Sequence, residues 1–582
     1  MRRITIPDFI LEVFEDPRKR GILFAGCLAL FAVGLVPRAL SPGLPSSQVA
    51  IRSLPEAQNL FLLVAFVSTA AIIAGGLVSD IYRRRSLLVG GLMVMAIGSA
   101  TSILYDHGVV FYVANFGAIA AAGVVLAYGI GSVAIAYEGI ARATALGFVY
   151  AAFGVGAAVS PAILTFFPVA VPGAGAETPA AYTFDTTLAY VLPAVASVVA
   201  LWAAYRWVPM IPGSLPARPA LVAGVALWSL SILALVSGAL GFFGPADQLL
   251  PMVLLIAGAA GTIVLSIAFK RRSDAMGSLV LDKRAVVAAL AVGVTIGFAQ
   301  AVPLMLLPVV FEYPLHYGTL FAILALAPFG LALVLAGPIT GILIGRFGPR
   351  GIMAGGTFAL GAANIAMAFI LAGMAGAVRR FYDANPEVAR VDLGAAHYAL
   401  FLLPLALIGA GFVLSTTVRT AIVFATTPRG LPASAAAINE ASVGLGSRIG
   451  IVVATTMVTL TALTSARAFT EGRPADEADA LVDEFDTALT ALGTPGYRDV
   501  FQGIFDSSGP AKLAAYAVSY IDGVTVALLL SGIVALVGAA LAWVLIGRRN
   551  PMRTVFDMQD ERQDADDPAA SSLAPGSSGS TD

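Results

Sequence analysis

The sequence predicts an all-α membrane protein in which two six-helix bundles flank two inserted helices, fourteen transmembrane helices in all. Three observations lead to this fold class: an extreme composition, fourteen long apolar segments, and a motif that recurs in both halves. Of the 582 residues, 58% are hydrophobic and 12% are charged, and the mean hydropathy is +0.89. Soluble domains average about 45–50% apolar and about 25% charged residues. Too few charges remain here to cover a soluble surface, and so apolar a chain is not disordered.

The segments follow from the length that a helix needs to cross the hydrocarbon core, about 20 mostly apolar residues. The expected spans are 21–40, 57–78, 86–104, 109–136, 143–167, 186–205, 221–243, 249–269, 285–310, 318–344, 351–375, 397–418, 432–463 and 520–546. The first span contains Pro37-Arg38 near its end and is followed by Ser41-Pro42-Gly43 rather than by a small-residue cleavage site, so it is expected to be a membrane helix and not a signal peptide.

Basic residues indicate the orientation, because cytoplasmic loops carry an excess of Lys and Arg. With the N-terminus inside, 24 of the 34 Lys and Arg residues fall in cytoplasmic segments and 9 on the external side, where Arg38 at the outer end of the first span is included, which leaves only Arg448 deep within a span. This asymmetry predicts a multi-pass protein of the plasma or inner membrane, with an even number of spans and both termini in the cytoplasm.

The two halves carry a similar turn at the end of their second helix. The first is Gly76-Leu-Val-Ser-Asp80-Ile-Tyr-Arg-Arg-Arg85 and the second is Gly341-Ile-Leu-Ile-Gly345-Arg-Phe-Gly348-Pro-Arg350. Asp80 lies 59 residues after the start of the first span, and Gly345 lies 60 residues after the start of the ninth. Spans 1–6 and 9–14 are therefore predicted to be repeated bundles, an arrangement typical of a rocking transporter.

These motifs resemble those of the major facilitator superfamily, and most closely its fourteen-helix drug:proton antiporter branch. That superfamily's turn motif is Gly-x-x-x-Asp-Arg-x-Gly-Arg-Arg, which is matched by Gly76, Asp80, Arg84 and Arg85 and, in the second half, by Gly341, Arg346, Gly348 and Arg350. The fifth span is similar to the antiporter pattern Gly-x8-Gly-x3-Gly-Pro and carries Gly147, Gly156, Ser160 and Pro161. The resemblance covers roughly 21–549 and implies a major facilitator-type fold.

The chain is expected to divide into five parts. They are a cytoplasmic amphipathic segment at 1–20, an N-terminal bundle at 21–205, a linker with helices 7 and 8 at 206–283, a C-terminal bundle at 284–549, and a disordered cytoplasmic tail at 550–582. The C-terminal bundle includes a long external loop at 464–519, in which apolar residues at helical spacing predict an amphipathic helix over the external mouth. The sequence allows two roles for this helix, a packed cap or an element that captures substrate.

The resemblance implies a cytoplasmic gate. The Asp80 carboxylate would face the N-terminal end of span 13, where a helix presents unpaired N–H groups and a partial positive charge. Basic side chains would complete a charge cluster that breaks when the halves rock, and Gly345 in place of an acid would make the gate asymmetric. Alternatively, the arginines only anchor the cytoplasmic side. The expected gating residues are Gly76, Asp80, Arg84, Arg85, Arg142, Gly341, Arg346, Gly348 and Arg350.

In the resembled antiporters, the fifth-span segment packs against the opposite half and seals the outside-closed state. Here Gly147, Gly156, Ser160 and Pro161 would allow close helix contact and a kink, although packing without any directional role explains them almost equally well.

Charges within the membrane are few, and they bear on coupling to protons. The resembled branch places an Asp in span 1 and an Arg in span 4, and neither is present in this sequence. Glu440 and Arg448 both fall in span 13, about 12 Å apart along the helix axis, so they cannot pair within a straight helix. Glu440 is the candidate proton carrier unless it is merely hydrated near the cytoplasmic rim. Arg448 is the candidate for orienting an anion or substrate, or for an interhelical ion pair.

Uncharged candidates for the central cavity come from the helices that line it in the resembled fold. They are Asn115, Tyr128, Gln300, Thr416 and Thr417, each of which could equally hold helices together. The single cysteine, Cys27, and three histidines leave no expected metal site, and a net charge of −1 gives no basic field for nucleic acid. No cofactor is expected, and without a phosphate-binding Gly-x4-Gly-Lys-Ser/Thr run the chain is not expected to be an ATP-hydrolysing enzyme.

Together these features predict a secondary transporter that exports small hydrophobic or amphiphilic compounds by alternating access. In one version it is a proton antiporter, and in another it is an uncoupled facilitator or lipid flippase. A non-transporting membrane sensor or assembly factor with the same fold is the third hypothesis. The expected partners are a small-molecule substrate, protons where transport is coupled, and membrane lipids; nucleic acid is not expected, and the protein is expected to be a monomer.

Overall fold

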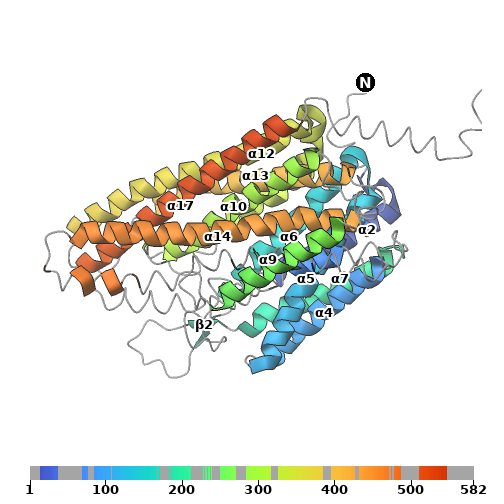
Figure 1. Ribbon diagram of the computed structural model, residues 1–582, viewed down its shortest axis with the longest axis horizontal. Helices are drawn as coiled ribbons and strands as arrows, with labels where there is room; N and C mark the ends of the chain where they lie inside the picture. The colour runs from blue at the N-terminus through green and yellow to red at the C-terminus, as the bar shows by residue number, and fades with distance from the viewer. Residues whose placement is uncertain are drawn as a thin grey trace, which may run out of the picture.

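The computed structural model shows a bundle of long helices (Figure 1). It describes residues 13–36, 69–76, 84–105, 108–166, 168–170, 182–184, 186–210, 249–270, 284–312, 314–315, 325–384, 395–426, 432–470 and 510–546, with single residues between 227 and 238 and between 474 and 486. Nine helices in these ranges are long and apolar enough to cross a membrane. The all-α membrane fold is confirmed, whereas fourteen spans remain a prediction. The tail at 550–582 lies outside the described residues.

The N-terminal bundle contains five described helices and a short helical stretch, 69–76, within the second predicted span. The helices are α2 (Pro17–Leu35), α4 (Arg84–Leu104), α5 (Gly108–Ala136), α6 (Gly139–Phe166) and α7 (Thr186–Trp207). Helix α2 begins four residues before the predicted start because Asp16 caps it: its carboxylate accepts a 2.8 Å bond from the Arg18 amide, and Pro17 suits the first turn.

The C-terminal bundle contains α10 (Arg284–Glu312), α12 (Ala327–Ala384), α13 (Ala395–Thr426), α14 (Pro432–Thr470) and α17 (Pro510–Leu545). Helix α12 covers the tenth and eleventh predicted spans. It is broken at Gly348, where φ is +76° and ψ is 159°, a conformation that glycine adopts without strain. Both α12 segments therefore meet at one end of the molecule, on the right in Figure 1, which we call the Gly348 end.

Several helices extend beyond their predicted ends. Helix α13 continues to Thr426 instead of 418, and α14 continues to Thr470 instead of 463. Helix α17 begins at Pro510, so the predicted external loop is shorter than 464–519. The cause is that the buried faces continue through these added turns, as Val423, Ala466 and Tyr516 show.

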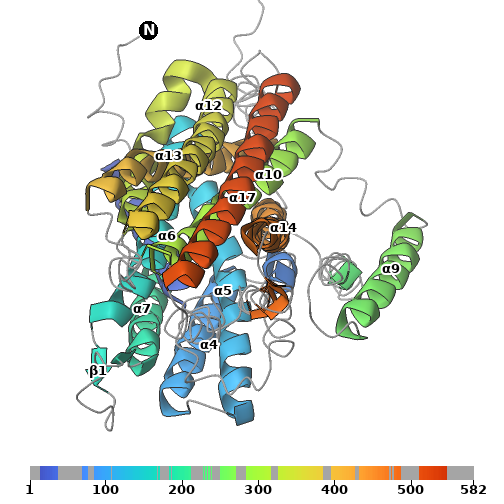
Figure 2. The same cartoon turned by 90° about the vertical axis from the view of Figure 1, so that its left-hand side faces the viewer.

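Two smaller features lie outside the bundles. Strands β1 (Pro168–Ala170) and β2 (Tyr182–Phe184) pair antiparallel, with Val169 opposite Thr183, between α6 and α7. Helix α9 (Leu249–Lys270) stands to one side of both bundles in Figure 2. Its Gly258 and Gly261 pack closely against Leu235 and Ser231 of the seventh predicted span.

Candidate functional site

The two bundles meet through α6 and α12, at positions where glycine, which has no side chain, lets the two backbones come close. A Cβ atom on Gly147 would overlap the carbonyl oxygen of Gly337, so the two backbones touch. A Cβ atom on Gly341 would lie 3.1 Å from the Cβ of Thr144. Gly147 lies eight residues into α6, about 12 Å from its start, so these contacts occupy the half of the membrane domain nearer the Gly348 end.

A second contact between the bundles is apolar and involves α14. Ile72 and Ala127 of the N-terminal bundle form one buried cluster with Ala437 and Ala441 of α14. Because this cluster also lies near the start of α14, both lines of contact close the same half of the molecule.

Arg419 lies inside this closed half, which corrects its predicted place in a cytoplasmic loop. It stands seven residues before the end of α13 and has no solvent exposure. Its Nη1 donates to the Asn439 carbonyl oxygen at 2.6 Å and to the Ser442 hydroxyl at 2.7 Å. Its Nη2 forms an ion pair with Glu440 Oε1 at 3.2 Å. A buried guanidinium is tolerated only with such partners, which explains why α14 presents three of them.

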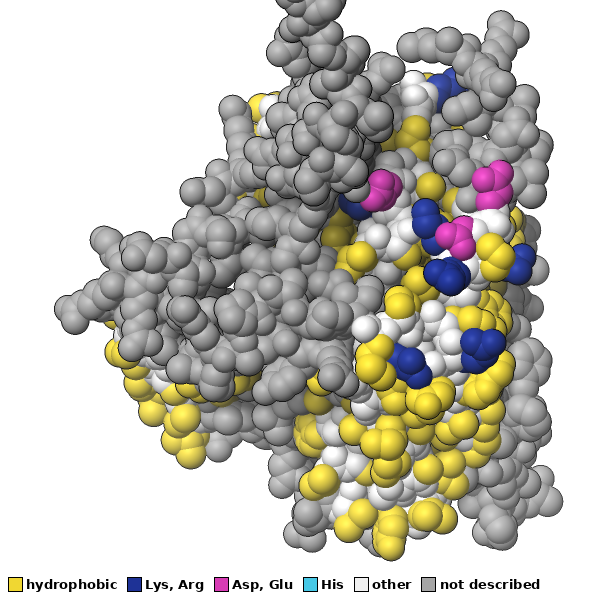
Figure 3. Space-filling view, turned by 90° about the vertical axis from the view of Figure 1, so that its right-hand side faces the viewer, with side chains coloured by type: hydrophobic (Ala, Val, Ile, Leu, Met, Phe, Trp, Pro, Cys, Tyr) yellow, Lys and Arg dark blue, Asp and Glu magenta, His cyan; other side chains and the backbone are white. Residues whose placement is uncertain are grey.

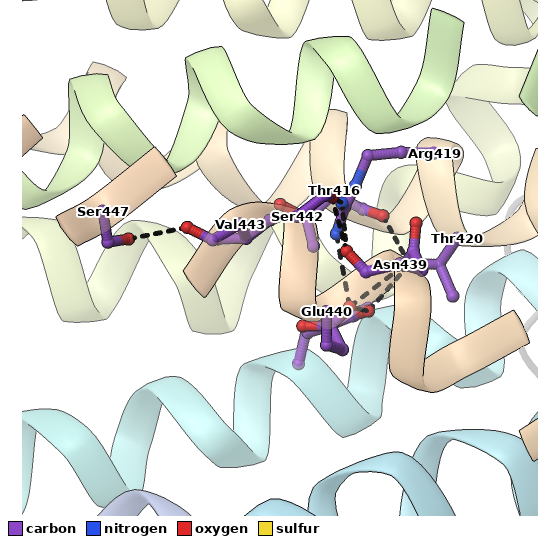
Figure 4. A network of polar contacts seen from close by, with 9 residues as sticks. Thr416, Arg419, Thr420, Asn439, Glu440, Ser442, Val443 and Ser447 are labelled. Atoms are coloured by element: carbon purple, nitrogen blue, oxygen red, sulfur yellow. Dashed lines mark hydrogen bonds and ion pairs between the residues drawn. The ribbon is translucent and has the colours of Figure 1, made fainter. Parts of the chain in front are cut away.

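Glu440 is 9% exposed, so it is buried rather than hydrated at a rim. Its Oε1 accepts bonds from Arg419, from Asn439 Nδ2 at 3.0 Å and from the Tyr150 hydroxyl at 2.6 Å. Figure 4 shows the residues of this arrangement that belong to the C-terminal bundle, with Arg419, Asn439 and Ser442 near Glu440. Tyr150 belongs to α6, and therefore one carboxylate oxygen links the two bundles.

Thr420 and Asn439 complete the cluster. The Thr420 hydroxyl lies 2.7 Å from the Tyr150 hydroxyl, accepts from Asn439 Nδ2 at 2.8 Å, and lies 2.8 Å from the Thr416 carbonyl. We call these seven residues the Arg419–Glu440 network: Tyr150, Thr416, Arg419, Thr420, Asn439, Glu440 and Ser442. It is a desolvated, charge-assisted group that spans α6, α13 and α14.

Arg448 lies eight residues beyond Glu440, about 12 Å further along α14 and away from the Gly348 end. Its Nε donates to the Thr69 hydroxyl at 3.1 Å. Thr69 is in the helical stretch of the N-terminal bundle, so this bond also joins the bundles, near mid-helix.

The uncharged candidates are not brought together. Asn115 donates to Ser102 Oγ and to the Phe111 carbonyl, both at 3.0 Å, and so joins α5 to α4. Thr416 and Thr417 are buried on α13, and their hydroxyls have no hydrogen-bond partner among the described residues. Two further candidates occupy other helices: Tyr128 is buried on α5, and Gln300 is partly buried on α10.

The predicted gate arginines also lie apart. The Arg85 guanidinium lies 4.2 Å from the ring centroid of Tyr205, and that of Arg350 lies 4.1 Å from the ring of Trp543. Each of these contacts stays within one bundle. Arg142 Nε donates to the Tyr137 carbonyl at 2.8 Å.

Some of the remaining motif residues lie outside the part of the chain that the structure describes. Asp80 and the side chains of Arg84, Ser160 and Pro161 lie outside the described residues. Gly76 is buried, Arg346 is exposed, and Gly156 packs α6 against the Phe31 carbonyl of α2 rather than against the other bundle.

With this geometry established, comparison with known families decides the classification. The Major Facilitator Superfamily profile matches residues 22–450. The chain belongs to the major facilitator superfamily. It is thus a multi-pass membrane protein and a secondary transporter working by alternating access, not an enzyme. A search of curated proteins by sequence finds no match.

Solved structures share the fold at low identity. The human organic anion transporter MFSD10 is 12% identical, with a TM-score of 0.50 over 89% of this chain and 100% of its own. The POT family transporter PepTSo is 15% identical, with a TM-score of 0.52 over 94% of this chain and 99% of its own. The proton:xylose symporter XylE is 12% identical, with a TM-score of 0.51 over 95% and 100%. Such likeness extends to the fold alone.

Proposed function

We propose that this transporter exports small hydrophobic or amphiphilic compounds in exchange for protons, as a member of the fourteen-helix antiporter branch, with Glu440 as the proton carrier. The observation that carries the proposal is the burial of Glu440 between the bundles, where it is paired with Arg419. A buried acid in a membrane protein is costly and marks ion or substrate pathways.

Coupling follows from how the environment of Glu440 changes during rocking. In the described state the carboxylate accepts bonds from Arg419 and from two neutral donors. When the bundles separate at the Gly348 end, Tyr150 leaves with its own bundle and water reaches the carboxylate. Protonation of Glu440 then depends on which side is open, and that dependence is the requirement for using a proton gradient.

We place the Gly348 end in the cytoplasm. Basic side chains gather on the face seen in Figure 3, which views the molecule from that end. Arg18, Lys19, Arg20, Arg206 and Arg346 are exposed residues at the helix ends there, in keeping with the excess of basic residues on cytoplasmic sides. The state described is then closed to the cytoplasm.

The substrate class rests on the candidates for the cavity lining. Apart from Arg448 they are uncharged: Asn115, Tyr128, Gln300, Thr416 and Thr417. The helices that carry these candidates, α5, α10 and α13, are otherwise mostly apolar, which favours a hydrophobic cargo, and Arg448, near mid-helix, would orient an anionic or hydrogen-bonding group on it.

The test is transport into inverted vesicles with a panel of hydrophobic and amphiphilic compounds, with and without an uncoupler. Glu440→Gln is expected to abolish gradient-driven accumulation while leaving exchange of cargo across the membrane. The matched control is Glu138→Gln, an exposed acid at the α5–α6 turn, which should transport normally. Accumulation by Glu440→Gln at the normal level would refute Glu440 as carrier, and insensitivity of the unmodified protein to the uncoupler would favour the facilitator or flippase.

A further inference from the structure

We infer that Tyr150 and Glu440 form a proton-released latch between the two bundles, with Arg419 as the residue that positions the carboxylate. The inference rests on the proposed proton coupling and adds to it the contact through which protonation would change the conformation. Tyr150 and Glu440 are 290 residues apart in sequence, yet their side chains are joined at 2.6 Å.

The latch depends on the charge of the acceptor. A hydroxyl that donates to a carboxylate makes a shorter and stronger bond than one that donates to a neutral acid. Protonation would weaken the Tyr150 bond and also leave the buried Arg419 guanidinium without its counter-ion. Both effects destabilise the state in which the bundles touch.

Arg419 fixes the position of Glu440 from one side only. It is bonded to the Asn439 carbonyl and the Ser442 hydroxyl of α14, so it moves with the C-terminal bundle. Tyr150 moves with α6. The contacts that must break when this half opens are therefore those of the Tyr150 hydroxyl with Glu440 and with Thr420, whereas the ion pair can persist within its bundle.

Glu440 is the one acid within the described part of the Arg419–Glu440 network. Among the described residues packed around it, α13 supplies Arg419 and α6 supplies the Tyr150 phenol. Its neighbours on α14 in the network are the uncharged Asn439 and Ser442, and the adjoining contact with the N-terminal bundle is the apolar cluster of Ile72, Ala127, Ala437 and Ala441. No second acid shares the site within this described set.

A cysteine pair reports closure without any substrate. Thr144 and Gly341 lie on opposite bundles, and a Cβ on Gly341 would be 3.1 Å from the Thr144 Cβ, so a small separation of the backbones brings the pair to the roughly 3.5–4.5 Å of a disulfide. The background is Thr144→Cys with Gly341→Cys and Cys27→Ala, and the measurement is the rate of oxidative cross-linking between about pH 5 and pH 8.5.

Because the thiolate fraction falls on acidification in every variant, each rate is compared with that of the background at the same pH. Tyr150→Phe keeps the ring and removes only the hydroxyl, so its rate should be about tenfold to a hundredfold below the background at the alkaline end and should approach the background at the acid end. Glu440→Gln should show the same pattern. Tyr398→Phe is the matched control, because its hydroxyl donates to the Ala325 carbonyl within the C-terminal bundle and should not matter.

Cross-linking of Tyr150→Phe at the background rate across the pH range would overturn the latch. If Glu440→Gln nevertheless abolished proton-driven transport, the proposed carrier would stand without the latch. Conversely, a rate for Tyr150→Phe that falls below the background only at the alkaline end would support the latch even if no proton-driven export of the tested compounds were found.

Discussion

Replacing Arg419 by methionine tests whether the Arg419–Glu440 network is one energetic unit. Methionine fills much of the volume of the arginine stem but offers no donor, so Glu440 loses its only described ion-pair partner. The guanidinium also gives up bonds of 2.6 Å and 2.7 Å to α14. Because Arg419 has no solvent exposure, water cannot replace these bonds without a change in packing.

The expected magnitude follows from burial of the pair. Removing one partner of a buried ion pair costs about 3–5 kcal/mol, since the other charge is left uncompensated. Arg419→Met and Glu440→Gln should each lower the free energy of unfolding by about this amount. The double variant removes both charges and should recover much of the loss, which gives a coupling energy of about 3 kcal/mol.

The assay is denaturant-induced unfolding in mixed micelles, for both single variants and the double variant, at one pH above neutrality. Arg206→Met, at an exposed arginine near the end of α7, is the control and should change the free energy of unfolding by less than about 0.5 kcal/mol. Additivity of the two single variants within about 0.5 kcal/mol would show that Arg419 and Glu440 are not coupled.

Three further predictions concern other contacts. Gly147→Leu should hold the bundles apart and abolish transport, whereas Gly90→Leu, where a Cβ meets nothing within 4 Å, should transport normally; equal transport by both would contradict the proposed close approach. Arg350→Lys should lose about 0.5–1 kcal/mol of unfolding free energy, because lysine lacks the planar group that covers Trp543, and this loss should vanish in a Trp543→Leu background. Tyr516→Phe removes a 3.0 Å bond to an acid in the segment between α14 and α17, so limited proteolysis there should quicken several-fold, and an unchanged rate would refute the anchoring role.

Composition and the repeated turn were sufficient to predict the fold class, because apolar length and motif spacing survive without tertiary information. These two features do not predict where the helices end. Arg419 was counted as a loop residue since basic residues usually mark the cytoplasmic side, although the apolar run after it continues to 425. Tertiary packing extends α13 through that run, and the ion pair then makes the buried charge tolerable.

Part of the site was within reach of the sequence. Arg419 lies seven residues before the end of α13 and Glu440 eight residues after the start of α14, so consecutive antiparallel helices place them at one depth. The role of Tyr150 could not be predicted from the sequence, because its partner is 290 residues away and nothing local marks a tyrosine in an apolar helix as a donor. The gate centred on Asp80 stays a prediction, since that residue lies outside the described ranges.

Two contacts between an arginine and an aromatic ring occur at equivalent places in the two halves of the repeat. Arg85 lies over Tyr205, and Arg350, at the equivalent place in the second turn, lies over Trp543. Each pair ties the third helix of a bundle to its sixth, so neither needs to break when the bundles rock. At both turns, therefore, one basic side chain links helices within its own bundle.

The buried ion pair, in contrast, belongs to one bundle only. By order in the repeat, α13 corresponds to α5, the helix where the resembled antiporters carry an arginine and this chain carries no basic residue. The buried guanidinium is instead Arg419, on the repeat partner of that helix, and its acid follows on the next helix as Glu440. Under the proposed proton coupling, this ion pair would stand in for the charges expected in spans 1 and 4. The proposal then assigns the proton chemistry to the C-terminal bundle and requires from the other bundle only the Tyr150 hydroxyl, which contacts the carboxylate.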